Sequence, residues 1–321
     1  MNEYSIAVSY FELFRQKRDQ SRSGEQPKLP SQAVWEEDTW TSADDANAKK
    51  ILKDNLEKCT ISSVVRPDDS SSLLGREDTN AWDQFYANHG NRFFKDRHYF
   101  VKAFPEEFSP SPEIASTETR TLVEIGCGVG NAILPLLEES DGIWDVVHGL
   151  DISSEAIQIL RQDARFVAFN KTGPDARKAY GHVCDISKEL PPLCSGISNC
   201  TTLIFCLSAI DPERHFEAAK HVVDSLKPGG VLVFRDYGRY DEAQMKLGTS
   251  RSKRIKENFY RKHDGTKCYY FDLEDLERLF CDRLGMKSLE LKYLRRVYGN
   301  KATTQVRRRI WVQGRFLKTS A

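Results

Sequence analysis

The sequence predicts an α/β fold: a doubly wound, seven-stranded sheet that ends in a β-hairpin and is preceded by a partly helical appendage. Three observations predict it. From residue 120 onward, short apolar runs alternate with segments of helical spacing, as they do when helices cover both faces of a parallel sheet. The Gly-rich turn E-I-G-C-G-V-G (Glu124–Gly130) follows the first of these runs, and no helical segment separates the last two.

Each expected strand is a short apolar or alternating run. The first opens onto the glycines, and the fourth, L-I-F-C-L, is apolar throughout, which is typical of a buried parallel strand. The expected strands are Thr121–Ile125, a run ending at Asp151, a run leading into Cys184 and Asp185, Leu203–Leu207, Val231–Arg235, and a closing pair around Leu289–Leu294 and Arg309–Phe316. The expected helices are Asn131–Glu139, Ser154–Gln162, Pro212–Leu226 and Asp272–Asp282.

Composition divides the chain into three parts. Residues 1–79 are expected to form a partly disordered or helical appendage, with a helix over Ser42–Lys58. Residues 80–112 are rich in aromatic side chains. In this part Asn80 is expected to cap a helix that ends near Gly90, and Ser109–Pro112 to form a linker. Residues 113–321 carry the alternating pattern and are predicted to form the main domain.

Charge is distributed unevenly although the net charge is zero. Residues 286–318 carry 10 Lys and Arg against one acidic residue, Glu290. This asymmetry indicates a polyanion held against the C-terminal part of the fold, or a solvated strand face. No apolar run is long enough to cross a bilayer, and we expect neither a membrane segment nor a secretory signal. The N-terminal segment has a cluster of basic residues, which is typical of a mitochondrial presequence. Glu3 and Glu12 argue against a presequence, because such peptides are poor in acidic residues.

The eight cysteines are scattered, and no C-x-x-C pair occurs. Cys194 and Cys200 lie in a loop-like stretch without a histidine nearby in sequence, so we expect no metal site. This use of cysteine favours a reduced compartment, and we expect the protein in the cytoplasm, with the nucleus as an alternative.

Three glycines, at positions 126, 128 and 130, give the turn a G-x-G-x-G spacing. The dinucleotide-binding fingerprint needs its third glycine at position 131, where this chain has Asn131. A turn of this kind lets the backbone approach a ligand closely, and the preceding Glu124 can accept hydrogen bonds there. The alternative is a purely structural strand-to-helix turn.

Two aspartates follow consecutive predicted strands. Asp151 can accept from the two hydroxyls of a ribose, and Asp185 from the amino group of an adenine, while Ile186 and Ile204 can cover the ring. In an open α/β sheet ligands bind outside the carboxyl ends of the strands, where these residues converge. Either aspartate alone could be a turn or cap residue. Their shared register favours a nucleoside site.

Several motifs together resemble one enzyme family. They are W-D-Q-F-Y (Trp82–Tyr86), N-R-F-F-K-D-R-H (Asn91–His98), E-I-G-C-G-V-G-N, L-I-F-C-L-S-A-I (Leu203–Ile210), F-R-D-Y-G-R-Y-D (Phe234–Asp241), E-N-F-Y (Glu257–Tyr260) and D-G-T (Asp264–Thr266). Over residues 80–318 the chain resembles the tRNA 3-methylcytidine methyltransferases. W-E-E-D-T-W (Trp35–Trp40) is similar to the N-terminal segment of the threonine-tRNA branch. The closing hairpin agrees with their class I Rossmann-like methyltransferase fold.

The resemblance implies methylation of N3 of cytidine 32 in a tRNA anticodon loop. S-adenosylmethionine would be the cofactor and S-adenosylhomocysteine the product. The segment Asn91–His98 would close over the cofactor and help to bind tRNA. The alternative for the upstream aromatic residues is ordinary core packing. The residues implied in cofactor binding are Trp82, Tyr86, Gly126, Gly128, Asp151, Asp185, Ile186 and Ile204.

Cytosine N3 is an unprotonated lone pair at neutral pH, so its attack needs no general base. Asp236 and Asp211 are the candidate catalytic carboxylates, because either could accept from the exocyclic amine. The alternative for Asp236 is a surface ion pair with Arg235 or Arg239. Candidate stacking residues are Phe205, Tyr237 and Tyr260. The expected tRNA contacts are Lys95, Arg97, His98, Arg235, Arg239, Arg261, Arg307 and Arg308.

Other functions stay open from the sequence alone. Methylation of a small molecule or a protein is one, although a small substrate needs neither the basic segment nor Asn91–His98. A cofactor-binding subunit that scaffolds a partner is another. Within tRNA methylation, serine-tRNA specificity with a synthetase partner is the alternative to threonine tRNA. The acidic appendage, residues 1–79, could bind tRNA or dock a protein partner such as an aminoacyl-tRNA synthetase.

Overall fold

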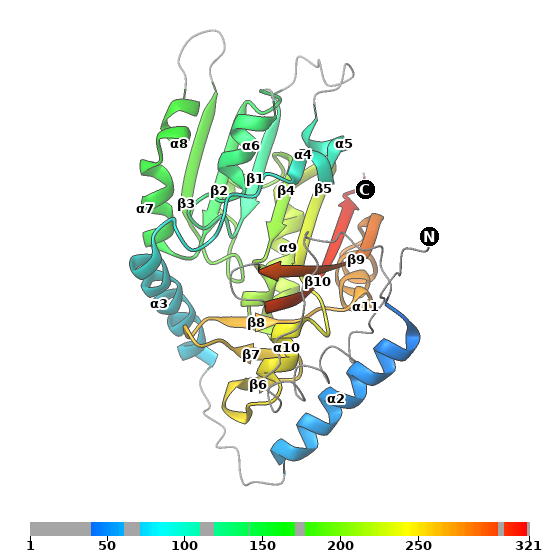
Figure 1. The fold of residues 1–321 in the computed structure, drawn as a ribbon. Helices are drawn as coiled ribbons and strands as arrows, with labels where there is room; N and C mark the ends of the chain where they lie inside the picture. Colours follow the sequence, from blue (N-terminus) through cyan, green and yellow to red (C-terminus); the bar gives the residue numbers. More distant parts are fainter. Residues whose placement is uncertain are drawn as a thin grey trace, which may run out of the picture.

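The molecule is built around a twisted seven-stranded sheet (Figure 1). The structure is a computed structural model, and it describes residues 40–60, 71–109, 119–140, 142–170, 177–300 and 305–319. The motif Trp35–Trp40, apart from its last residue, and most of the Ser109–Pro112 linker lie outside the described residues. The strands are β1 Thr121–Ile125, β2 Val146–Asp151, β3 Lys178–Val183, β4 Ser198–Ile204, β5 Leu226–Tyr237, β9 Lys287–Asn300 and β10 Gln305–Leu317.

The strand order is β3-β2-β1-β4-β5-β10-β9. The first five strands are parallel, and β10 runs antiparallel to both β5 and β9. All five residues of β1 are buried, because helices cover both faces of the sheet at its centre. The doubly wound sheet with a closing hairpin, predicted from the sequence, is confirmed.

Helices pack on the two faces of the sheet around two apolar clusters. One cluster holds Val123 and Leu203 against α9 and the segment that follows α11. The other holds Leu122 and Val147 against the helices of the opposite face. The helices are α4 Phe100–Ala103, α5 Pro105–Phe108, α6 Ile133–Glu139, α7 Ser154–Gln162, α8 Ala164–Phe169, α9 His215–Ser225, and α11 Leu273–Leu276 continued by a π-helix over Glu277–Arg283.

Several predicted bounds are corrected. The fourth strand ends at Ile204, because Phe205 has a φ of 53° and turns the chain out of the sheet. The fifth strand begins earlier, at Leu226. Helix α3 spans Ser71–His89 and runs through Asn80, which therefore caps nothing. The predicted end near Gly90 is confirmed, and the φ of 55° at that glycine suits a helix C-terminus.

An insertion after β5 forms a second, small sheet. It contains α10 Glu242–Leu247 and the antiparallel strands β6 Arg254–Lys256, β7 Phe259–Arg261 and β8 Lys267–Tyr269. Helix α2 Ser42–Thr60 has its Leu52 side chain beside Gly248 at the end of α10. Figure 1 places α2 at the edge of the molecule, away from the main sheet. Among the described residues, no helix combines the length and the apolar character needed to cross a membrane.

Candidate cofactor and acceptor site

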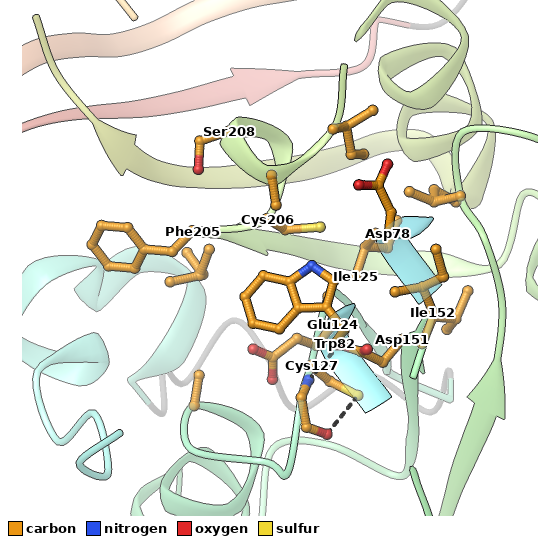
Figure 2. A pocket seen from close by; sticks show the side chains of 18 of the residues that line it. Asp78, Trp82, Glu124, Ile125, Cys127, Asp151, Ile152, Phe205, Cys206 and Ser208 are labelled. Carbon is orange, nitrogen blue, oxygen red and sulfur yellow. Dashed lines mark hydrogen bonds between the residues drawn. The ribbon is translucent and has the colours of Figure 1, made fainter. Parts of the chain in front are cut away.

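A pocket lies at the carboxyl ends of β1, β2 and β4, and residues of helix α3 and of the small sheet also line it. Figure 2 shows the Trp82 side chain of α3 among Glu124, Asp151 and Cys206. The Gly-rich turn forms its floor, α3 one wall, and residues of the insertion another. All eight residues implied in cofactor binding line it. The lining residues used below are Asp78, Trp82, Tyr86, Arg97, Glu124, Gly126, Gly128, Asp151, Asp185, Ile186, Ile204, Phe205, Tyr237, Lys262 and Lys267.

Two glycines of the turn cannot be replaced without a clash. Gly126 and Gly128 have φ values of 71° and 54°, which side chains rarely adopt. A Cβ at Gly126 would overlap the Cys206 side chain, and one at Gly128 the hydroxyl of Tyr86. The turn therefore presents bare backbone to the pocket, as the sequence predicts for a close approach to a ligand.

Asp151 stands at the end of β2 with both carboxylate oxygens held. Oδ2 accepts from the Gly128 N–H at 2.8 Å, and Oδ1 accepts from the Ser153 N–H at 2.9 Å. Burial raises the pKa of Asp151 to about 6. A carboxylate fixed in this way still has lone pairs facing the pocket, so it can accept from vicinal hydroxyls.

Asp185 follows β3 and lies at the other end of the pocket floor. Its Oδ1 accepts from the Ser187 N–H at 3.1 Å, and its Oδ2 is 2.8 Å from the Lys188 Nζ. Burial opposes its ionisation, but Lys188, Ser187 and Arg214 lower the pKa of Asp185 below its ordinary value. Ile186 beside it is 5 % exposed and gives this end an apolar surface.

Glu124 is the pocket's most unusual carboxylate. It is 2 % exposed, and its Oε2 has no hydrogen-bond partner among the described residues. Burial raises the pKa of Glu124 to about 8. A buried acceptor without a partner, facing a cavity, is suited to a cationic donor on a ligand. The sequence already predicts that Glu124 accepts hydrogen bonds beside the turn, and the structure adds its burial and its unpaired oxygen.

Helix α3 presents one face to the pocket. Asp78, Trp82 and Tyr86 are spaced four residues apart, so they lie along one side of the helix. The Trp82 and Tyr86 rings stack with centroids 5.9 Å apart. Asp83 holds the helix to the start of α7, where it accepts from the Ser153 hydroxyl at 2.6 Å. The Trp82 and Tyr86 rings both line the pocket and pack in a small apolar cluster.

A buried ion pair closes the wall between α3 and the insertion. The Lys267 Nζ is 2.7 Å from the Asp78 carboxylate, and the two side chains are 3 % and 15 % exposed. Both residues line the pocket. The sequence offers no signal for this pair, because its members are far apart in the chain and belong to different segments.

We expect Lys267→Met to lower the free energy of unfolding by about 3 kcal/mol, because it leaves the buried Asp78 carboxylate uncompensated. Urea unfolding with and without Asp78→Asn measures this, and the double variant should recover most of the loss. Lys220→Met is the control, since it breaks the exposed Lys220–Asp224 pair on α9 and should cost under about 1 kcal/mol. An equal loss of unfolding free energy in Lys267→Met and Lys220→Met would contradict the prediction.

The turn after β4 and the end of β5 form an aromatic corner of the pocket. The centroids of the Phe205 and Tyr237 rings lie 4.9 Å apart. The Arg97 guanidinium lies 4.8 Å from the Phe205 centroid, and the Lys262 Nζ lies 5.3 Å from that of Tyr237. The left-handed backbone of Phe205 is strained, which is common at binding sites. Tyr260, the third candidate stacking residue, is buried in a separate cluster outside the pocket lining.

The two candidate catalytic carboxylates stand behind the pocket wall. Asp236 is fully buried and accepts from the backbone N–H groups of Ser208 and Tyr237, at 2.9 and 2.8 Å. Burial raises its pKa to about 6. Asp211 caps the turn Pro212–Arg214 and pairs with the Lys256 Nζ at 2.9 Å. Neither lines the pocket, so each is placed to hold backbone in position and not to contact a bound base.

The alternative interpretation of Asp236 as a surface ion pair is also wrong. Arg235 is 8 % exposed, lies 4.1 Å from the Tyr99 centroid and donates to Gln313. Arg239 pairs with Asp272 and Asp275 at 2.8 and 3.1 Å. Arg235 is buried on β5 and Arg239 is held by two carboxylates after it, so we leave both out of a tRNA surface.

The other basic residues differ in their placement. Arg97 lines the pocket, and Lys95, His98 and Arg261 are exposed. The hydrogen bond that the His98 ring donates to Glu139 raises the pKa of His98. The backbone N–H of Arg308 donates to Glu242 at 2.8 Å. The side chain of Arg307 lies outside the described residues.

Known proteins resemble this chain in both sequence and fold. A methyltransferase domain model matches residues 93–291. The chain is 32% identical over 322 residues to the tRNA N(3)-methylcytidine methyltransferase Mettl2 of Drosophila melanogaster, covering 98% of this chain and 93% of that protein. It is 32% identical over 276 residues to human tRNA N(3)-cytidine methyltransferase METTL6, covering 84% and 91%. A SAM-dependent methyltransferase from Anabaena variabilis shares the fold, with a TM-score of 0.53, 14% identity and coverage of 80% and 98%.

Proposed function

Because the chain belongs to the tRNA N(3)-cytidine methyltransferase family, we propose that it methylates N3 of cytidine 32 in the anticodon loop of threonine tRNAs. The single observation that carries the chemistry is one pocket that joins a nucleoside-binding floor to an aromatic, cationic corner. The threonine branch is supported by Trp35–Trp40 in the sequence. We place the enzyme in the cytoplasm, with the acidic appendage as the segment that meets tRNA or a synthetase.

The pocket fits S-adenosylmethionine by the chemistry of its donors and acceptors. Asp151 would accept from the ribose hydroxyls, and Asp185 with Ile186 and Ile204 would hold the adenine. The unpartnered Glu124 oxygen would accept from the ammonium group of the methionine part. Once bound, the cofactor supplies an electrophilic methyl group on a sulfonium.

The chain's own residues then have to hold the base. Since N3 needs no deprotonation, the main contribution is to place its lone pair in line with the methyl group. The target base must be unpaired, because pairing occupies N3, and an anticodon loop offers such bases. Phe205 and Tyr237 offer faces for stacking, and Arg97 and Lys262 offer cations for the adjoining phosphates. Asp236 fixes the backbone of this corner from behind.

The decisive assay is incubation of the full chain with methyl-labelled cofactor and unmodified total tRNA, followed by identification of the labelled nucleoside. We expect 3-methylcytidine. Purified threonine and serine isoacceptors, each with a cytidine-to-uridine change at position 32, separate the tRNA species and the position. Label found in protein, or in no macromolecule, would refute the proposed reaction.

We expect tRNA affinity to fall steeply with salt, because phosphate contacts release counterions. Lys95→Ala and Arg261→Ala, at exposed positions, should each reduce the slope of log K against log salt by about 1. Fluorescence anisotropy with an anticodon stem-loop over a salt series measures this. Lys220→Ala on α9 is the control and should leave the slope unchanged. An affinity indifferent to ionic strength would contradict the proposed surface.

Cofactor binding should release close to one proton near pH 7. The pKa of Glu124 is about 8 in the free protein, so the carboxyl is mostly protonated at pH 7. A ligand ammonium beside it favours the carboxylate, and affinity should therefore rise with pH between about 6 and 8. Calorimetry in two buffers of different ionisation enthalpy counts the proton. Glu124→Gln should abolish the release, and an unchanged proton count in that variant would exclude Glu124.

A further inference from the structure

Two histidines and a cysteine meet away from the pocket. His148 lies on β2, His182 on β3, and Cys194 ends the short turn Pro192–Cys194. One nitrogen of each ring and the thiol sulfur all lie within 4.8 Å of one another. The His148 Nδ1 is 3.0 Å from the His182 Nε2. None of the three lines the pocket.

The strand register brings the two rings together. On β2, His148 and Leu150 point to one face, and Leu150 is paired with His182 on β3. The rings consequently stack, with centroids 5.2 Å apart and planes at 20°. The chain then returns under this face, and the turn brings Cys194, which is fully buried, beside them. From the sequence we expect no metal site, because no histidine is near Cys194 in the chain, but two are near it in space.

Neutral imidazole nitrogen and thiolate sulfur are the ligands that zinc prefers. A neutral imidazole has a lone pair to offer on one ring nitrogen. His148 is 5 % exposed and Cys194 is fully buried, while His182 is half-buried. Two nitrogens and one sulfur leave one position for water in a tetrahedral set.

We propose that His148, His182 and Cys194 bind one zinc ion that fastens the turn Pro192–Cys194 to strands β2 and β3. Binding replaces the thiol proton of Cys194, which leaves to solvent, and needs no change of oxidation state. The site is structural. Asp151 follows His148 by three residues and ends β2, and Asp185 follows His182 by three residues just after β3, so the ion stiffens the part of the sheet that positions them. The proposal is independent of the methylated substrate.

The test uses the full chain, purified without a metal-chelating tag. After removal of bound metal, zinc is titrated by calorimetry, and cobalt is added to a second sample. We expect one zinc per chain, a higher Tm on binding, and a thiolate-to-cobalt charge-transfer band. Cys194→Ser and His182→Gln should each weaken zinc binding by more than about 100-fold, since loss of an outer partner alone costs about 10–100-fold.

Cys281→Ser is the matched control, because Cys281 is half-buried on the π-helix and outside the trio, and it should bind zinc as the parent does. Circular dichroism and the metal-free Tm verify that each variant folds, and Cys194→Ala and His182→Asn provide second substitutions. Zinc affinity unchanged in the Cys194 and His182 variants would overturn the proposal. So would a cobalt form without a sulfur charge-transfer band, which would leave a hydrogen-bonded histidine pair.

Discussion

Asp151→Ala is expected to weaken cofactor binding by at least about 100-fold and to abolish methylation at ordinary cofactor concentrations. Its carboxylate faces the pocket and is held by the N–H groups of Gly128 and Ser153. Hydrogen bonds to a charged group contribute about 1.5–3 kcal/mol each, and two ribose hydroxyls would lose them together. Calorimetry with the cofactor and with its demethylated product measures the loss.

A cap carboxylate outside the pocket is the control for this variant. Asp163 accepts from the Arg165 N–H at 2.9 Å at the start of α8. Asp163→Ala removes a helix cap and should lower stability, yet leave the cofactor Kd unchanged. If Asp151→Ala bound the cofactor as tightly as the parent, the assignment of the ribose to β2 would be lost.

The pH dependence separates the two roles of Asp151. Its folded pKa of about 6 lies above the ordinary value of 3.8, so its ionisation opposes folding of the free protein. This contribution makes the free protein less stable as pH rises from about 4 to about 6. Asp151→Asn should remove it while it weakens the cofactor site. Chemical unfolding without cofactor at pH 4.5 and pH 7.5 measures the difference between parent and variant.

The sequence could predict the sheet and the nucleoside floor for a common reason. Parallel strands bury both faces and end at one edge of the sheet, so an apolar run followed by a carboxylate identifies both the strand and the place of its side chain. Asp151 and Asp185 were located in this way. The glycine turn could be predicted from the spacing of its glycines, because side chains rarely adopt the φ values found at Gly126 and Gly128.

The acceptor side could not be predicted in this way. Arg235 and Asp236 are adjacent on β5, so their side chains point to opposite faces, and a two-residue period does not say what covers each face. Arg235 is buried because β10 brings Gln313 against it, and Asp236 is buried because the turn at Ser208 covers it. The Asp78–Lys267 pair depends on where the insertion folds, which no local pattern encodes.

The group formed by His148, His182 and Cys194 could not be predicted from the sequence either. Spacing in sequence identifies a zinc site only when the ligands lie in one short loop or hairpin. Here the ligands come from two parallel strands joined by helices and from a later turn. Only the strand register brings His148 beside His182, and a one-residue slip would turn one ring to the opposite face.

Asp236→Asn is expected to lower kcat by about 10–100-fold while it changes the cofactor Kd less than about twofold. Asp236 does not line the pocket, so it acts by positioning the turn at Ser208 and the backbone of Tyr237. An amide has one acceptor oxygen where the carboxylate has two, and its NH2 would face a backbone donor. The loss of one charge-assisted bond, about 1.5–3 kcal/mol, would shift the aromatic corner that holds the base.

Single-turnover methylation of tRNA, measured beside calorimetry with the cofactor, separates this role from the alternatives. Asp224→Asn is the matched control, because Asp224 pairs with Lys220 on α9 outside the pocket lining, and it should leave kcat unchanged. A kcat unchanged in Asp236→Asn would mean that the corner keeps its geometry without the second acceptor. A parallel loss of cofactor affinity would mean that the pocket floor moves with it. Only a fall in kcat at constant cofactor Kd identifies Asp236 as the residue that aligns the acceptor side, because the two sides of the pocket rest on different strands.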